Sequence, residues 1–258
     1  MRFASVMAIA ALLTAGAVCA DEIPQAERRS GYSFMAPDTK AMQDDEASNP
    51  GTLWVLDGEA LWNRKTGAAE KACADCHNDA RASMKGVAAR YPAFDKTLGR
   101  PVNLEQRINL CRVNHQLAMP LPYESRELLA LSAFVARQSR GMPMETGDDP
   151  QLEPFIAQGR ELFMQRQGQL NLGCTNCHDD NWDKHLAGSA ITQAHPTGYP
   201  IYRLEWQSLG SLQRRLRSCI TGIRAQPYDY GAPELVELEL YLMSRARGMP
   251  VETPAVRP

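Results

Sequence analysis

The pentapeptide C-T-N-C-H, residues Cys174–His178, places two cysteines two residues apart and follows them directly with a histidine. The same pattern occurs earlier in the chain as C-A-D-C-H, residues Cys73–His77. Thiols at this spacing attach to the two vinyl groups of one haem c, and the adjacent histidine reaches the iron as the proximal ligand. A disulfide or a zinc site explains two such motifs less well. The sequence therefore predicts two covalently bound haem c groups, attached through Cys73, Cys76, Cys174 and Cys177, with His77 and His178 as axial ligands.

The N-terminus indicates an exported protein. Arg2 is followed by an uncharged apolar stretch that ends in V-C-A, directly before Asp21. This pattern is typical of a secretory signal peptide, predicted here as residues 1–20. The stretch is short for a membrane span, and the residues before Cys19 suit a lipid anchor poorly. We therefore expect a periplasmic protein without a membrane anchor.

The composition of the mature chain excludes some classes of partner. Without residues 1–20 the chain carries 27 basic and 30 acidic residues, a net charge of −3. This balance argues against binding to nucleic acid and against a polybasic membrane surface. In an oxidising compartment free thiols usually pair, so each cysteine needs an explanation.

The two halves of the chain repeat one another, which indicates two copies of one unit. In each half a glycine lies fifteen residues before the first cysteine of the haem motif. A lone cysteine comes after each motif, and each half closes on almost the same seven residues. The matching segments are G-E-A-L-W (Gly58–Trp62) and G-R-E-L-F (Gly159–Phe163), L-E-Q-R-I-N-L-C (Leu104–Cys111) and L-Q-R-R-L-R-S-C (Leu212–Cys219), and R-G-M-P-M-E-T (Arg140–Thr146) and R-G-M-P-V-E-T (Arg247–Thr253).

Each copy has the pattern of an all-α unit. An amphipathic helix precedes the haem loop, and an irregular stretch rich in Gly and Pro leads to a short helix that carries the lone cysteine. A final helix begins near Glu127 or Glu234 and ends at a glycine and a proline, which stop helices. No alternating strand pattern is visible. We predict an N-terminal extension over 21–50, either an extended arm or a partner-binding segment, and two domains over 51–147 and 148–258.

The lone cysteines are the first candidates for the distal ligand of each haem. Cys111 and Cys219 lie 34 and 41 residues after the histidine of their motif. A disulfide between them is an alternative, although equivalent positions in separate copies belong beside separate haems. His115, four residues after Cys111, is a second candidate for the first haem. Other sulfur and imidazole groups fit less well: Met142 and Met249 come after the final helix and are interpreted as packing residues, and His185 and His195 as surface or loop residues.

Arginines surround the second lone cysteine. Arg215 precedes Cys219 by one helical turn, and Arg107 precedes Cys111 in the same way. Nearby arginines lower the pKa of a thiol, and an arginine can equally bind a haem propionate. Features of the second copy alone suggest that a small anion approaches there: Arg214, Arg217, Arg224 and Gly222.

Two C-x-x-C-H motifs, a lone cysteine in each copy, R-R-L-R-S-C-I-T-G-I-R-A-Q-P-Y and the repeated R-G-M-P together resemble the SoxA family, the haem subunits of thiosulfate-oxidising SoxAX cytochromes. The resemblance runs from about Gly51 to Thr253. It implies two tandem class I cytochrome c-like domains. It also implies a heterodimer with a monohaem SoxX-like subunit, and a SoxYZ-like carrier protein as partner.

The resemblance further implies an activity and its residues. The reaction is that of an L-cysteine S-thiosulfotransferase, which couples thiosulfate oxidatively to a carrier-protein cysteine to give a cysteine S-thiosulfonate. Cys219 is then the distal ligand and the catalytic residue, in the form of a persulfide, and Arg215 binds thiosulfate. Cys111 ligates the first haem. Two other functions stay open: a non-catalytic dihaem electron carrier, and a thiosulfate dehydrogenase that forms tetrathionate.

Overall fold

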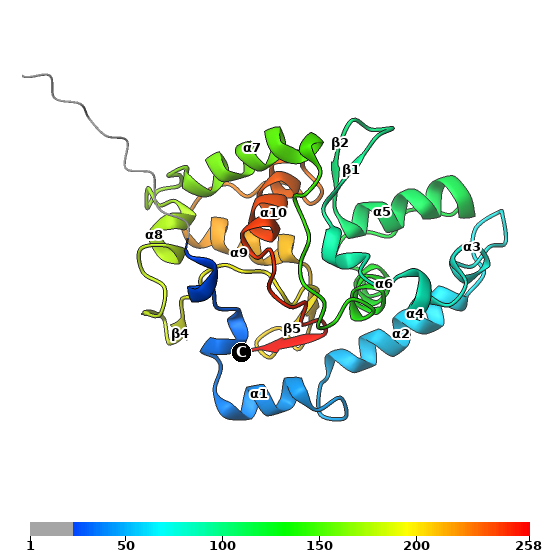
Figure 1. Cartoon of the computed structure of the whole chain (residues 1–258), viewed down its shortest axis with the longest axis horizontal. Coiled ribbons are helices and arrows are strands. Elements are labelled where there is room, and N and C mark those ends of the chain that lie inside the picture. Colours follow the sequence, from blue (N-terminus) through cyan, green and yellow to red (C-terminus); the bar gives the residue numbers. More distant parts are fainter. Residues whose placement is uncertain (1–22) are drawn as a thin grey trace, which may run out of the picture.

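The computed structural model describes residues 23–258 (Figure 1). The predicted signal peptide and Cys19 lie outside the described residues. The rest of the chain forms two similar helical modules, side by side, with the N-terminal segment against the second. No helix in the described part of the chain is long and apolar enough to cross a membrane. The first module contains α2 (Gly51–Asn63), α3 (Ala74–His77), α4 (Ala80–Ser83), η3 (Ala88–Arg90), β1 (Ala93–Asp95), β2 (Arg100–Val102), α5 (Leu104–Cys111), η4 (Arg112–Gln116) and α6 (Arg126–Arg137).

The second module has its main helices and its β5–β6 hairpin in the same order as the first, and it adds a hairpin after its haem motif. It contains η5 (Pro150–Leu152), α7 (Glu153–Met164), α8 (Cys174–His178), β3 (His185–Leu186), β4 (Ser189–Ala190), β5 (Ile201–Arg203), β6 (Ser208–Gly210), α9 (Leu212–Gly222), α10 (Pro233–Arg245) and β7 (Ala255–Arg257). The hairpin of β3 and β4 has no counterpart between α3 and β1 of the first module.

A close helix crossing forms the centre of each module. The first helix, α2 or α7, packs against the last helix, α6 or α10. Gly58 and Gly159 lie at these crossings: a Cβ on either would come within 2.1 Å of the carbonyl oxygen of Ala130 or Glu237 in the facing helix. The repeated glycine of the sequence is therefore explained by the approach of two backbones. Behind the crossing, apolar side chains of the second module form one core cluster: Phe163, Leu212, Leu216, Ile220, Leu235, Leu238, Tyr241 and Leu242.

The fold is helix-rich, as the all-α prediction expects, and it also contains short strands. β1 pairs with β2, β3 with β4, and β5 with β6, all antiparallel, and the C-terminal β7 joins β5 in parallel. Each strand has only two or three residues, too few for an alternating pattern to show in the sequence. The hairpins nevertheless fix where α5 and α9 begin, because β2 and β6 run directly into these helices, which carry Cys111 and Cys219.

The repeated R-G-M-P segments join the two modules. They lie antiparallel to each other, with the amide of Met144 donating to the carbonyl of Met249 at 2.9 Å and the amide of Val251 to that of Met142 at 2.9 Å. Met144 is buried in a cluster with Ala89, Ala246 and Val251, against which Met249 packs. Met142 and Met249 thus lie at the junction of the modules, which agrees with their interpretation as packing residues.

Two buried carboxyl groups lie between the modules. Glu239 of α10 accepts hydrogen bonds from the amide groups of Asn103, at 3.1 Å, and Gln213, at 3.3 Å. Glu105 of α5 is buried beside it. Burial raises the pKa of both carboxyl groups, and the charges of Glu239 and Glu124 raise the pKa of Glu105 further. Glu105 is therefore held in its protonated form near neutral pH.

The N-terminal segment folds onto its own chain, so the prediction of an extended arm was wrong. It contains η1 (Gln25–Glu27), η2 (Gly31–Phe34) and α1 (Pro37–Asp44), and it packs along the second module and β7. Hydrogen bonds that join it to that surface include Arg29 N to Gln193 Oε1 at 2.6 Å, Val256 N to Gln43 Oε1 at 3.0 Å, and Asn49 Nδ2 to Pro254 O at 2.9 Å. Contacts this distant in sequence leave no local pattern to read.

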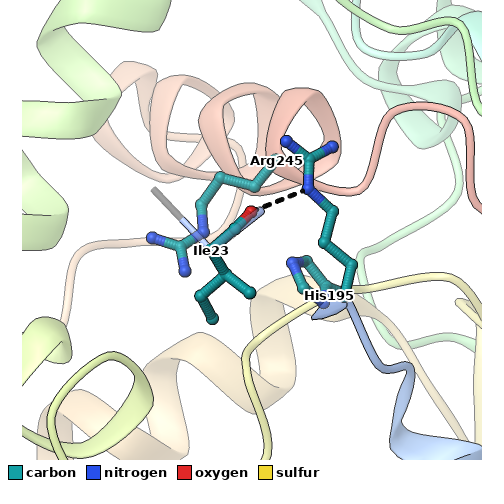
Figure 2. A pocket seen from close by; sticks show the side chains of 4 residues that line it. Ile23, His195 and Arg245 are labelled. Atoms are coloured by element: carbon teal, nitrogen blue, oxygen red, sulfur yellow. Dashed lines mark hydrogen bonds between the residues drawn. The ribbon is translucent and has the colours of Figure 1, made fainter. Parts of the chain in front are cut away.

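The start of this segment covers His195. Ile23 and Arg28 line, together with His195 and Arg245, a cavity with room for about one water-sized molecule (Figure 2). The Nδ1 atom of His195 donates to the carbonyl of Arg29 at 2.9 Å. His195 is therefore a loop residue as predicted, but it is buried rather than on the surface, whereas His185 is exposed on β3.

Candidate functional site

The second haem motif is held from behind by a backbone carbonyl. Cys174–His178 forms the short helix α8, and the Nδ1 atom of His178 lies 2.6 Å from the carbonyl oxygen of Thr192. A carbonyl only accepts, so Nδ1 carries the proton and Nε2 keeps its lone pair. This fixes the tautomer that an axial ligand needs. Burial, and then the positive charge of Arg215, lower the pKa of His178, which keeps the ring neutral.

A buried ion pair fixes the same motif from its other side. Arg245, at the end of α10, donates to Asp179 at 2.7 Å, and its side chain is 5% exposed. The guanidinium group also lies 4.6 Å from the ring centroid of Phe163, the aromatic residue four positions after Gly159. Helix α10, helix α7 and the haem motif therefore meet at one cation.

The first haem motif is more open. His77, in α3, is exposed, and within residues 23–258 its ring makes no hydrogen bond. Trp62 lies behind it, with ring centroids 5.7 Å apart, and donates through Nε1 to the carbonyl of Asn78 at 3.2 Å. The hairpin of β3 and β4 that leads to Thr192 has no counterpart here. The two motifs share a sequence pattern but differ in how firmly their histidine is held.

The helices with the lone cysteines begin and end in equivalent ways. Asn103 and Ser211 cap them: the side chain of Asn103 accepts from the amide of Gln106, and that of Ser211 from the amide of Arg214. After each helix, the chain forms a backbone hydrogen bond with the tight turn that precedes its own haem motif. The pairs are Ala68 N to Leu117 O at 3.2 Å and Leu170 N to Ile223 O at 3.3 Å.

These ties place each lone cysteine beside its own motif. Cys111 is half-buried; burial raises the pKa of its thiol, and the nearby thiol of Cys76 raises it further. Cys219 is exposed. Burial, and then the proximity of Cys219, raise the pKa of Cys174 to about 12, and the same two causes raise that of Cys177. Cys111 and Cys219 are not bonded to each other, so the structure does not form the disulfide that was the alternative.

His115 and Cys111 differ in exposure. The segment after Cys111 is a π-helical turn, Arg112–Gln116. His115 is exposed. Of the two candidates for the first haem, Cys111 is the one beside the motif.

Two of the three arginines of α9 pack on aromatic rings, and the third, Arg215, does not. Arg214 lies over the ring of Trp206 at 4.2 Å and Arg217 over that of Tyr230 at 4.5 Å, so both have packing roles. Arg215 is half-buried, and its guanidinium group makes no hydrogen bond or ion pair with any described residue. Its charge lowers the pKa of His178 and of Tyr199, so it lies close to both groups, and it precedes Cys219 by one turn of α9.

Two residues beside Cys219 were not predicted. Arg203 is the last residue of β5, and Tyr199 lies two residues before this strand. Burial raises the pKa of Tyr199 and lowers that of Arg203, and in both groups the proximity of Cys219 contributes a smaller upward effect. In the sequence, the only trace of this is the dipeptide Tyr-Pro, present as Tyr91-Pro92 and Tyr199-Pro200 in the Gly- and Pro-rich stretches.

The donor set of each module fits a haem and not a bare metal ion. Across residues 23–258 no three His, Cys, Asp or Glu side chains gather to hold a metal ion, which argues against a zinc site. Each motif instead offers two free thiols and one histidine, with a further thiol nearby. In the second module the histidine is already oriented with Nε2 unprotonated.

Comparison with known proteins agrees with these observations. The model of the SoxA/TsdA cytochrome c domain matches twice, over residues 57–144 and 158–251. The chain belongs to the SoxA/TsdA cytochrome c family. As a member of this family it binds haem c covalently. The two matched segments coincide with the two modules of the fold.

Several proteins similar to this SoxA/TsdA chain are named as subunits of an enzyme. It is 38% identical over 235 residues to the L-cysteine S-thiosulfotransferase subunit SoxA of Pseudaminobacter salicylatoxidans, covering 91% of this chain and 82% of that one. It is 38% identical over 231 residues to the subunit of the same name from Rhodovulum sulfidophilum, covering 90% and 80%. Among solved structures, a chain of SoxXA from P. pantotrophus matches with a TM-score of 0.86 at 30% identity, covering 90% of this chain and 87% of that one.

Proposed function

We propose that this chain is the haem subunit of an L-cysteine S-thiosulfotransferase. The observation that carries the proposal is Cys219, an exposed thiol next to a haem motif and next to Arg215, whose guanidinium group pairs with no residue of 23–258. The names of the relatives support the same activity. An exposed sulfur with a free cation beside it suits a small sulfur-containing anion that must come close to react.

The proposed reaction joins thiosulfate to a cysteine of a carrier protein. The carrier thiolate and the outer sulfur of thiosulfate form one S–S bond, and two electrons leave, so the product is a cysteine S-thiosulfonate. When bound, haem c supplies the redox chemistry that takes up these electrons. Arg215 binds the thiosulfate anion, and Cys219, in the persulfide form that the family resemblance implies, is the active-site sulfur beside which this S–S bond forms.

The residues proposed to hold haem divide between the modules. Two thioether links per module come from the paired cysteines of each motif, with His178 and Cys219 as axial ligands in the second module and His77 and Cys111 in the first. The firmer hold on His178, through Thr192 and the neighbouring Asp179–Arg245 pair, supports placing the chemistry in the second module.

The proposal includes partners, boundaries and location. A haem-bearing subunit of the SoxX type is proposed as the partner, supported by the likeness to a chain of SoxXA. A SoxYZ-type carrier and thiosulfate are proposed on the names of the relatives. The domain boundaries at 51–147 and 148–258 enclose the two matched segments. A periplasmic location with cleavage after Ala20 remains a prediction from the sequence.

Product analysis tests the proposal against both alternatives. The oxidised complex is mixed with thiosulfate, with and without the carrier, and the products are identified by mass spectrometry. We expect the carrier cysteine to gain a thiosulfonate only when thiosulfate and the complex are both present. Tetrathionate formed without the carrier would instead indicate a thiosulfate dehydrogenase. Reduction by many donors, with neither product, would indicate a simple electron carrier.

A further inference from the structure

The repeat allows the surroundings of the two lone cysteines to be compared position by position. Arg107 precedes Cys111 by four residues, and Arg215 precedes Cys219 by four. The third residue of β1 is Asp95, paired with Arg100 across the hairpin. The third residue of β5 is Arg203, paired with Ser208 in the same register. Both strand residues come four positions after the tyrosine of the Tyr-Pro dipeptide, so an aspartate in one module corresponds to an arginine in the other.

In the first module the arginine is fully engaged. Arg107 donates to Asp95 Oδ2 at 2.7 Å and to the hydroxyl of Tyr91 at 3.2 Å. Asp95 is also held by the amides of Thr97 and Leu98, so the carboxylate is fixed in place. The amide of Leu98 and then Arg107 lower the pKa of Asp95, which keeps the pair charged. The net charge of this pair is zero, so it has little attraction for an anion.

In the second module the position equivalent to Asp95 is occupied by a second arginine, Arg203. The side chain of Arg203 is 12% exposed, lies 5.3 Å from the ring of Trp206, and pairs through Nε with Glu205 at 2.8 Å. Glu205 is 51% exposed, so this counter-ion lies toward solvent. Burial, and then the charge of Arg215, lower the pKa of Arg203, and the proximity of Cys219 acts in the opposite sense. Arg203 and Arg215 occupy the positions at which Asp95 and Arg107 are in contact in the first module, so two guanidinium groups face the same space, one helical turn from the exposed thiol.

We propose that Arg203 and Arg215 together bind the dianionic sulfur oxyanion beside Cys219, and that the exchange of Asp95 for Arg203 is what restricts anion binding to the second module. This inference rests on the proposed function for the identity of the anion, thiosulfate. Two arginines brought close without a buried carboxylate between them repel each other, and a bound dianion removes that repulsion. Glu205 then remains as a solvent-side counter-ion when the site is empty.

The other use for such a pair is a haem propionate. An arginine bound to a propionate would change the haem spectrum or its redox potential when replaced, and it would leave thiosulfate binding unchanged. Direct binding of thiosulfate therefore separates the two roles.

The test measures thiosulfate affinity and carrier modification in the same variants. The oxidised complex with its haem groups is titrated calorimetrically with thiosulfate in the absence of carrier, for wild type, Arg203→Gln and Arg203→Lys. A matched control, Arg160→Gln, removes one exposed charge from α7 of the same module. Because a lost charge-assisted hydrogen bond weakens binding about tenfold or more, we expect the Kd of Arg203→Gln to rise by about that factor. Arg203→Lys should rise less, and Arg160→Gln should match wild type.

Each outcome has one meaning. Equal Kd values for wild type and Arg203→Gln would overturn the role of Arg203 and leave the proposed function intact. A shifted haem potential in Arg203→Gln with unchanged Kd would assign the residue to a propionate, which also overturns the inference. If Arg203→Gln does not fold, Arg203→Lys decides by its own Kd against wild type. An unmodified carrier with the wild-type complex would overturn the proposed function instead.

Discussion

Replacing the crossing glycines tests the packing that holds each module together. Gly58 lies where α2 crosses α6, and Gly159 where α7 crosses α10. An added Cβ would meet the carbonyl oxygen of Ala130 or Glu237 at 2.1 Å, whereas ordinary contacts begin at 3.4 Å. The atom that it meets belongs to a helix backbone and cannot rotate away. The two helices of a module would therefore have to separate by about an ångström to accept the methyl group.

The expected loss of stability is the difference between two opposing effects. Alanine favours a helix over glycine by about 1 kcal/mol. Overpacking costs about 1–3 kcal/mol, and we expect the upper end here because the obstacle is backbone. The net prediction is a loss of about 2 kcal/mol in the free energy of unfolding for Gly58→Ala, and a similar loss for Gly159→Ala.

Denaturant unfolding of the haem-loaded protein, monitored by circular dichroism, measures this loss. Gly222→Ala is the control, since it is also a helical glycine but a Cβ there meets nothing within 4 Å. The control should be neutral or more stable by up to about 1 kcal/mol. Crossing variants as stable as wild type would refute the account of the repeated glycine.

Two further predictions concern buried charge. Arg245→Ala should destabilise the protein by about 3 kcal/mol, because it leaves the largely buried Asp179 without its partner. The control Arg247→Ala, at an exposed ion pair, should cost less than about 0.5 kcal/mol. Equal losses of unfolding free energy for the two variants would contradict this. A carboxyl whose pKa is raised by folding binds more protons in the folded state, so the stability of wild type should fall as the pH rises from about 6.5 to 8, above the range in which the lowered pKa values of His178 and His195 act in the opposite sense. Glu105→Gln, which copies the residue at position 213, should flatten that fall and gain about 1.4 kcal/mol at pH 8 for each unit by which the pKa of Glu105 is raised. A wild-type stability that is constant or rises over this range would show that the carboxyl groups of Glu105 and Glu239 are not protonated.

Features with a local or repeated pattern could be predicted from the sequence. The C-x-x-C-H motifs identify the haem chemistry through fixed spacing alone. The internal repeat showed that Cys111 and Cys219 are equivalent, and the fold then placed each beside its own motif. The glycines ahead of the motifs were visible as repeated letters, but their reason, the close approach of two helices, required the structure.

Other features depend on contacts that leave no pattern. The strands are two or three residues long, and their lengths hide any alternation. The N-terminal segment is held by residues more than 160 positions away, such as Gln193. Arg203 lies within an irregular stretch where the two copies differ in sequence. Its correspondence with Asp95 became visible only through the shared register of the two hairpins.

The central claim is that the second module performs the chemistry and that Cys219 is the residue that does so. The most direct measurement compares Cys219→Ala with Cys111→Ala in the complete complex. Thiosulfate and carrier are added, and the mass of the carrier protein is recorded over time. We predict no thiosulfonate on the carrier with Cys219→Ala and continued modification with Cys111→Ala, with covalent haem retained in both. Carrier modification at the wild-type rate by Cys219→Ala would contradict the account.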